Sequence, residues 1–415
     1  DDFDPDSNRG YYSDAWARVA EFFMHEELRA TTQQPEHEIV YINTQTENDT
    51  IPDYANLSMV GLNIRSSTEI QQLQQFSVYC NKGILSTNSF PEVLKDLLTN
   101  KRYGAGRVLN SLQIDDMSFM EAAAFCESRR YYFDGIISEK INLRSWAAET
   151  SANFLLDFVI RNGKFALQPA VDFDGAVEIT GLYTSGNIIE DSFQLSYAEE
   201  ADRIPPRVQV RWREEKPDLQ NGLFPITRQV TVFENGFADS SSPLEQIDLT
   251  AYATSQQHAI DLAKLICRKK RLITHTVTFS TTPPESSLDI GSVFKLGLEA
   301  LSYEQPKNGA IAANGEVTSW PPLDDGSYAA LVWDGTTLEE TTIVITDGKS
   351  APVNSVFCLQ ESVGQTGTYK TQSLSFNDDG NIDVEASFYP TDASGISLLV
   401  DGFDSPGNWT IEGAI

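Results

Sequence analysis

The sequence is poor in the residues from which metal sites and nucleophilic active sites are built. Among its 415 residues there are only four cysteines and four histidines. The cysteines lie far apart, with no C-x-x-C pair and no paired histidine beside them: Cys80, Cys126, Cys267 and Cys358. This spacing predicts no zinc site, and we expect the thiols to be small buried apolar groups in a reducing cell.

The histidines fall in no recognisable catalytic motif. The sequence contains no G-x-S-x-G, H-E-x-x-H, Walker or G-x-G-x-x-G pattern around His25, His37, His258 or His275. We expect His258, in the first turn of a predicted helix, and His275, in a predicted strand, to have structural roles. The sequence therefore predicts no catalytic, cofactor-binding or metal-binding residue, and we expect a protein that is not an enzyme and needs no cofactor.

Long apolar runs and positive charge are also scarce. Nothing approaches the ~18 consecutive apolar residues of a membrane span, and no signal peptide or starting methionine is present, so we expect Asp1 to mark processing or the edge of a larger chain. The 60 acidic residues outnumber the 30 basic ones and give a net charge of −30. Such a surface repels phosphate, which argues against sequence-specific nucleic-acid binding and against docking on anionic membranes.

The acidic excess is concentrated at the two ends of the chain. Residues 1–60 carry 13 acidic and 3 basic side chains, and residues 301–415 carry 17 and 3. The sequence therefore predicts acidic modules on either side of a nearly balanced middle.

Local signals predict where helices and strands begin. Ser89, Ser118 and Thr254 each precede a Glu or Gln by three residues, which is the capping-box pattern of a helix start. Apolar residues at helical spacing follow each of them, and the last of these three helices is predicted to span 254–271. A separate apolar stripe predicts a fourth helix over 145–158. Asn162-Gly163 predicts a two-residue hairpin turn. Strands are predicted at 39–42, 57–64, 194–197, 207–212, 228–233 and 274–280.

These elements predict a mainly β fold with one α+β domain and several small β-barrel or sandwich domains. The predicted divisions are an acidic β-rich segment (1–75), an α+β domain (76–185), a β-rich domain with one long helix (186–305), a small barrel of OB type (306–390) and the start of a further module or linker (391–415).

The only cationic cluster is Arg268-Lys-Lys-Arg271. It falls at the C-terminal end of the predicted 254–271 helix, where positive side chains complement the helix dipole. We therefore expect it to cap that helix and to pair between subunits, and not to bind nucleic acid.

Several segments form an ordered set of landmarks. The first spans 88–106 and ends in Arg102-Tyr-Gly-Ala-Gly106, and Ile114-Asp-Asp116 and Ala122-Ala-Ala-Phe-Cys126 follow it. Later landmarks lie at 161–169, 193–197, 208–212, 259–268, 289–293 and 372–386. In this order they resemble the tail-tip host-specificity hub proteins of long-tailed bacteriophages, over roughly residues 55–390.

The resemblance implies a structural virion protein at the tail tip, assembled in the bacterial cytoplasm. Its implied architecture is a trimeric hub that closes the distal end of the tail tube and takes part in host adsorption and DNA ejection. The implied partners are two further copies, the distal tail protein, the tape measure protein and fibres, with the host receptor bound through regions beyond this chain. An acidic lining would suit a DNA channel, because it gives phosphates nothing to bind.

Within the first landmark, Arg102, Tyr103, Gly104 and Gly106 form a structural motif. We expect it to be a helix C-cap in which Gly104 supplies the left-handed conformation and Gly106 frees the next turn.

Two other classes of function remain open at the level of sequence. One is a glycan-active hydrolase that uses a carboxylate pair such as Asp172 and Asp174. The other is a carbohydrate-binding adhesin in which Trp320, Trp333 and Trp409 stack on sugars, although tryptophans between strands more often pack in a core.

Overall fold

The computed structural model describes two strands near the N-terminus and most of the chain from residue 88 onward. The described residues are 37–38, 63–64, 88–137, 140–161, 163–173, 175–214, 226–283, 288–297, 307–360 and 366–413. Strand β1 (His37–Glu38) pairs with β2 (Asn63–Ile64) in a unit of residues 1–82, and residues 83–415 form a second unit. The predicted strand at 39–42, most of that at 57–64, and Cys80 lie outside the described residues.

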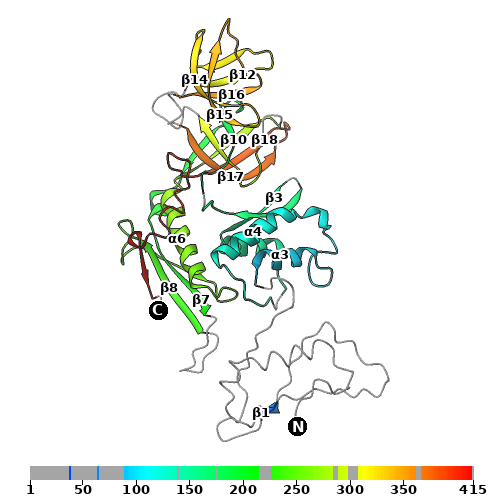
Figure 1. Cartoon of the computed structure of the whole chain (residues 1–415), viewed down its shortest axis with the longest axis vertical. Coiled ribbons are helices and arrows are strands. Elements are labelled where there is room, and N and C mark those ends of the chain that lie inside the picture. Colours follow the sequence, from blue (N-terminus) through cyan, green and yellow to red (C-terminus); the bar gives the residue numbers. More distant parts are fainter. Residues whose placement is uncertain are drawn as a thin grey trace, which may run out of the picture. The chain divides into compact units, whose positions relative to one another are not determined.

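The second unit is mainly β, as predicted (Figure 1). Its larger sheets contain six, five and four strands, and a two-stranded hairpin accompanies three of its helices. The described strands form open sheets, and no closed barrel occurs among them.

The α+β part of this unit comes first along the chain. It consists of α3 (Phe90–Thr99), the 3-10 helix η1 (Ser111–Gln113), α4 (Asp116–Arg129), α5 (Leu143–Asn153), β3 (Leu156–Arg161) and β4 (Lys164–Pro169). The predicted hairpin turn is confirmed, since Arg161 pairs with Lys164 and Gly163 has a φ of 73°. The predicted 145–158 helix ends earlier, at Asn153, and the chain then enters β3.

The predicted capping boxes are largely wrong in detail. Ser89 is the N-cap of α3 but its hydroxyl makes no capping bond. Ser118 lies inside the first turn of α4, where its hydroxyl donates to the Asp115 carbonyl and accepts from the Leu167 N–H at 3.2 Å. Because α4 packs against β4, the Ser118 hydroxyl bonds to Leu167 of that strand and does not cap the helix as the pattern predicted. A complete capping box occurs instead at Asn110 of η1.

A four-stranded sheet and the long helix α6 (Gln256–Leu272) form the next layer. The sheet order is β19 (Trp409–Glu412), β8 (Ile226–Glu234), β7 (Arg207–Glu214) and β9 (Leu244–Asp248), with η5 (Pro406–Asn408) just before β19 and η2 (Glu200–Arg203) before β7. Alternate residues of β7 and β8 are buried, and α6 packs against these two strands (Figure 1). Ser255 accepts the capping bond, one residue later than predicted.

The remaining strands form two further sheets. The six-stranded order is β5 (Ile179–Thr184), β11 (Val293–Gly297), β17 (Gly367–Phe376), β18 (Ile382–Phe388), β10 (His275–Thr281) and β6 (Gln194–Tyr197). The five-stranded order is β13 (Val317–Trp320), β12 (Asn308–Ile311), β16 (Ser355–Leu359), β14 (Gly326–Trp333) and β15 (Leu338–Ile345).

The sheets do not follow the predicted divisions at 185, 306 and 390. Strand β5 pairs with β11 across the first of these boundaries, and β17 and β18 join the six-stranded sheet instead of a barrel over 306–390. The five-stranded sheet is therefore an insertion between β11 and β17. Strand pairing, which is non-local, decides these boundaries.

The apolar cores match this arrangement. One core joins α3, α4, α5 and α6 to the four-stranded sheet, a second belongs to the six-stranded sheet, and a third belongs to the five-stranded sheet. A small fourth core links Leu182 of β5 to Trp333, Val356 and Cys358 of the inserted sheet. No helix in the described part of the chain has the length and apolarity needed to span a bilayer.

Candidate interaction surfaces

The turn that follows α3 contains the Arg-Tyr-Gly-x-Gly landmark, and it satisfies the carbonyl groups at the end of that helix. The Asn100 carbonyl accepts from the N–H groups of Gly104 and Gly106, both at 3.1 Å, and the Leu97 carbonyl accepts from Ala105 at 2.8 Å. Helix ends leave such carbonyls without partners inside the helix. The landmark is therefore built into the fold as a cap.

The predicted left-handed conformation at Gly104 is wrong. Neither Gly104 nor Gly106 has a positive φ. Both are glycines because the turn passes too close to the helix for a side chain. A Cβ on Gly104 would lie 2.0 Å from the Leu97 oxygen, and one on Gly106 would lie 1.9 Å from the Thr99 oxygen.

The other two landmark residues also contact the end of α3. The Tyr103 hydroxyl donates to the Asp96 carboxylate, although half of the Tyr103 side chain remains exposed. The Arg102 N–H donates to the Asn100 side chain at 2.9 Å. These contacts give the motif a structural role and leave the Arg102 side chain exposed.

The basic run at the end of α6 is engaged within the chain. Arg271 donates two hydrogen bonds to the Glu234 carboxylate, at 2.8 and 3.0 Å, and the Arg268 Nε lies 2.9 Å from the same carboxylate as an ion pair. Lys270 pairs with Glu245. These side chains thus form ion pairs from α6 to β8 and β9 within the chain. The expected pairing between subunits stays a prediction.

The same helix holds the C-terminal segment of the chain. Arg268 donates to the backbone carbonyls of Leu398 and Asp401 at 3.2 and 3.1 Å, and the Lys264 ammonium donates to the Phe403 carbonyl. Burial lowers the pKa of Lys264. Two cations of α6 therefore fix the backbone that leads into β19.

His258 and His275 have the structural roles predicted for them. His258 is fully buried, its Nε2 donates to the Asn153 carbonyl at 2.7 Å, and its ring stacks on Tyr131. Burial lowers the pKa of His258 to about 4. His275 lies with its Nε2 2.8 Å from the Tyr369 hydroxyl, and burial lowers its pKa as well.

The predicted hydrolase carboxylates and the cysteines fall only partly within the described residues. Burial raises the pKa of Asp172, while Asp174, its predicted partner in a hydrolase, lies outside the described residues. Asp261 is held by Tyr131 and Gln257 inside the core. Cys126, Cys267 and Cys358 are buried as expected. Within the described ranges no group of three or more His, Cys, Asp or Glu side chains could hold a metal ion.

Two of the three tryptophans considered for sugar binding are buried. Trp333 and Trp409 are 8% and 5% exposed and belong to apolar cores, and the Trp409 Nε1 donates to the Gly402 carbonyl at 3.1 Å. The side chain of Trp320 lies outside the description. For two of its three tryptophans, the adhesin hypothesis is therefore wrong about exposure.

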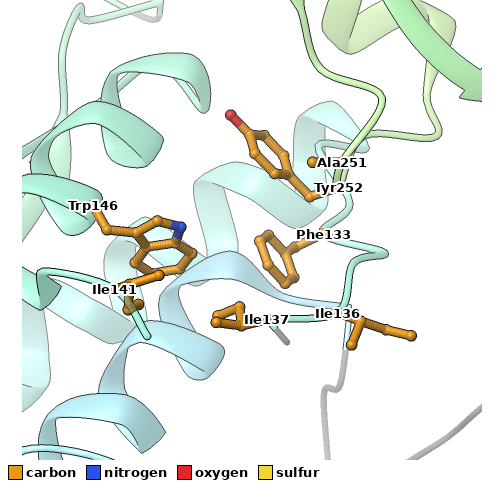
Figure 2. A pocket seen from close by; sticks show the side chains of 7 residues that line it. All are labelled: Phe133, Ile136, Ile137, Ile141, Trp146, Ala251 and Tyr252. Atoms are coloured by element: carbon orange, nitrogen blue, oxygen red, sulfur yellow. The ribbon is translucent and has the colours of Figure 1, made fainter. Parts of the chain in front are cut away.

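An apolar hollow was not predicted from the sequence. It has a volume of about 230 Å³ and lies between the segment that follows α4, the start of α5 and the loop that follows β9. Figure 2 shows the aromatic rings of Phe133, Trp146 and Tyr252 around it, with Ile136, Ile137, Ile141 and Ala251 completing the lining.

Ring stacking and a hydrogen bond hold the residues that line the hollow, and charged residues lie close to them in the sequence. Phe133 and Tyr252 stack with ring centroids 5.6 Å apart, and the Tyr252 hydroxyl accepts from the Asn153 amide at 2.6 Å. Lys140 and Arg144 flank Ile141 in the sequence and are exposed, without an ion pair among the described residues. The carboxylates of Asp248 and Glu149 oppose them, and both contribute to a raised pKa of Tyr252, whose main cause is burial. No spacing signal announces this site, because its walls are about 110 residues apart in the sequence.

Comparison with known proteins gives partial structural likenesses only. No protein-family profile matches the chain, and no curated protein matches it. A chain from the virion of a native gene transfer agent particle has 13% identity and a TM-score of 0.37, covering 62% of this chain and 42% of its own length. The 43 kDa tail protein of prophage MuSo2 from Shewanella oneidensis has 10% identity and a TM-score of 0.25, covering 63% and 56%. The chain thus spans about half the length of each neighbour.

Proposed function

We propose that this protein is a structural component of a phage-type tail, located at the tail tip as a subunit of the hub that closes the tail tube. In this role three copies surround the tube axis, contact neighbouring tail proteins, and take part in host adsorption and DNA ejection. The proposal starts from the ordered landmarks of the sequence and their resemblance to tail-tip hub proteins.

The observation that supports the proposal most is that the first landmark, at 88–106, forms hydrogen bonds within the fold. The N–H groups of Gly104, Ala105 and Gly106 all point to carbonyls at the end of α3, so the turn offers no donor cradle to a substrate. The landmark at 259–268 likewise lies in α6, whose apolar face packs on β7 and β8. Both landmarks have structural roles within the fold, which is consistent with a structural protein of an assembly.

The distribution of charge supports passage of DNA. Three of the four cations in the basic run at the end of α6 form ion pairs with Glu234 and Glu245, which reduces the positive charge that this run offers to a phosphate backbone. The 60 acidic residues of the chain give a negative surface, which offers no gain from counterion release when DNA passes. In the assembled ring we expect carboxylates to dominate the axial lining.

The decisive experiment is to find the protein in purified particles and to image the tail. We expect a threefold density for this chain at the distal tip, and tails that fail to assemble or lack a tip when its gene is deleted. Normal, infectious tails in the deletion strain, or particles without the protein, would refute the proposal.

The hydrolase hypothesis predicts a different result. Purified protein should turn over a glycan, and Asp172→Asn should abolish that turnover. We expect no turnover on glycans in either form, because no sequence motif assembles a nucleophile and a base around Asp172, whose side chain is exposed. Turnover that disappears in Asp172→Asn would replace the hub proposal.

A further inference from the structure

We propose that the turn after α3 is a membrane-contact surface, whose cations bind the anionic headgroups of a phospholipid bilayer and whose apolar side chains enter the headgroup layer. We call residues 101–108 the basic turn. Its exposed side chains are those of Lys101, Arg102, Tyr103, Arg107 and Val108. The inference goes beyond the proposed hub role, because it adds a ligand of another kind and does not depend on the number of copies.

The backbone of the basic turn is fixed by hydrogen bonds. The Val108 N–H donates to the Ala105 carbonyl at 2.8 Å, and the Arg107 Nε donates to the Lys101 carbonyl at 2.7 Å. The second bond brings the two ends of the turn together, so the cations of both ends belong to one surface. A surface held in this way loses little conformational freedom when it binds.

The cations of the basic turn are not neutralised within the described part of the chain. Lys101, Arg102 and Arg107 form no ion pair there, and residues 97–114 contain no acidic side chain. The basic run at 268–271 differs in this respect, because three of its four cations are paired. The basic turn therefore offers three positive charges to an anionic ligand.

The net charge of −30 does not decide this local contact. At physiological ionic strength charges are screened over about 8 Å, so the cations that touch the headgroups act most strongly. Two of the three carboxylates nearest along the sequence are themselves paired, Asp116 with Lys95 at 3.1 Å and Asp115 with Arg161 at 3.4 Å. The repulsion expected from the composition as a whole is therefore reduced at the basic turn.

Exposed apolar side chains accompany the cations. Val108 is 87% exposed, which is the largest fraction among the exposed large apolar side chains of the described residues, and Leu112 in η1 is 76% exposed. The Tyr103 side chain is half exposed, while its hydroxyl donates to Asp96. Exposed apolar side chains that lie together mark a site of interaction.

The mixture of residue types favours a bilayer as the partner. Lysine is depleted at protein–protein interfaces, whereas Lys, Arg and Tyr side chains suit the headgroup layer, where an apolar body and a polar end are both satisfied. Because Val108 follows Arg107, insertion of the valine brings the guanidinium to the level of the phosphates. Each Lys or Arg near an anionic bilayer strengthens binding about fivefold. Three such cations with a few apolar side chains predict reversible binding.

The test measures binding of the full chain to phospholipid vesicles by cosedimentation. We expect binding to phosphatidylcholine vesicles that contain about 30% phosphatidylglycerol, and little binding to phosphatidylcholine alone. Lys101→Gln with Arg102→Gln should weaken binding on the order of 30-fold, because it removes two cations. The variant should fold normally, since neither side chain forms an ion pair. Val108→Ser should weaken binding roughly fivefold.

The matched control removes the same charge elsewhere. Arg211→Gln with Lys349→Gln replaces one exposed arginine and one exposed lysine that lie outside the basic turn. Val344→Ser is the apolar control, because Val344 is 54% exposed on β15. We expect both controls to bind vesicles as the wild type does. Equal weakening by the control pair and by Lys101→Gln with Arg102→Gln would overturn the inference.

A spin label measures insertion directly. The three described cysteines are buried, so a Cys80→Ser background leaves an introduced thiol as the site of labelling. A label at Val108→Cys should become shielded from a water-soluble relaxation agent when anionic vesicles are added, and a label at Val344→Cys should stay accessible. Continued access at position 108, or the absence of binding to anionic vesicles, would overturn the inference.

Other outcomes separate this surface from the hub role. A wild-type chain that ignores vesicles, but whose copies associate less when Lys101 and Arg102 are replaced, would show that the surface binds protein and would overturn the membrane contact. Normal tails built from a chain that binds no vesicles would overturn the contact and leave the hub proposal standing. Vesicle binding by a chain that is missing from purified particles would overturn the hub proposal alone.

Discussion

Replacing Glu234 should release the C-terminal segment from α6. The Glu234 side chain is 4% exposed and faces Arg268 and Arg271, which are 8% and 19% exposed. Glu234→Gln keeps the shape but leaves two buried cations without a counter-charge, and breaking a buried pair in this way destabilises by about 3–5 kcal/mol. Because Arg271 retains some access to water, we expect about 3 kcal/mol.

The assay is urea unfolding followed by fluorescence, together with hydrogen exchange. We expect the free energy of the first unfolding transition to fall by about 3 kcal/mol. Amide exchange should become faster between Leu398 and Phe403, because the carbonyls of these two residues accept from Arg268 and Lys264. The control is Glu245→Gln, which removes the partner of Lys270 at a site where both side chains are at least one third exposed. Such a pair contributes less than about 1 kcal/mol. Equal losses in the two variants would refute the reasoning.

Three further predictions concern single side chains. Gly104→Ala should lower the free energy of unfolding by about 1–3 kcal/mol, because its Cβ would strike the Leu97 oxygen, whereas Gly407→Ala, whose Cβ meets nothing, should be neutral in the same urea titration. His258 is neutral in the fold with a pKa of about 4 but titrates at 6.5 when unfolded, so its contribution is complete above pH 6.5 and is lost as the pH falls through 4. Between pH 7 and 4 this loss should be about 3 kcal/mol, and a stability-against-pH curve for His258→Gln should be shallower there; parallel curves would contradict it. Trp409→Ala should cost about 3–5 kcal/mol and expose the C-terminal strand to proteolysis, and an intact protease pattern would show that β19 does not depend on this ring.

Local chemistry predicted much of the secondary structure. Gly163 marks the hairpin turn, and the run of apolar residues after Ser255 marks α6, because both signals act within a few residues. Ser118 shows the limit of this reasoning: its hydroxyl satisfies Asp115 and Leu167 inside a helix, and only the packing of β4 against α4 makes that role visible.

Long-range pairing was beyond the reach of sequence patterns. The strand at 367–376 falls within the small barrel predicted over 306–390, yet it pairs with β11 and β18 of the six-stranded sheet. The hollow has the same origin, because Trp146 and Tyr252 meet only when α5 and the loop after β9 are brought together. The glycines of the landmark turn were identified correctly, but the reason for them is contact with α3 and not the sign of φ.

The insertion of the five-stranded sheet makes that module a replaceable cassette. Leu296 and Gly367 are opposite each other in the β11–β17 ladder, so the polypeptide leaves and re-enters the six-stranded sheet about 5 Å apart. Recombination could therefore exchange or delete the intervening residues without changing the register of the ladder that carries them. The apolar contact that must form again after such an exchange is small. It centres on Leu182 of β5, which packs against Trp333, Val356 and Cys358 of the insert.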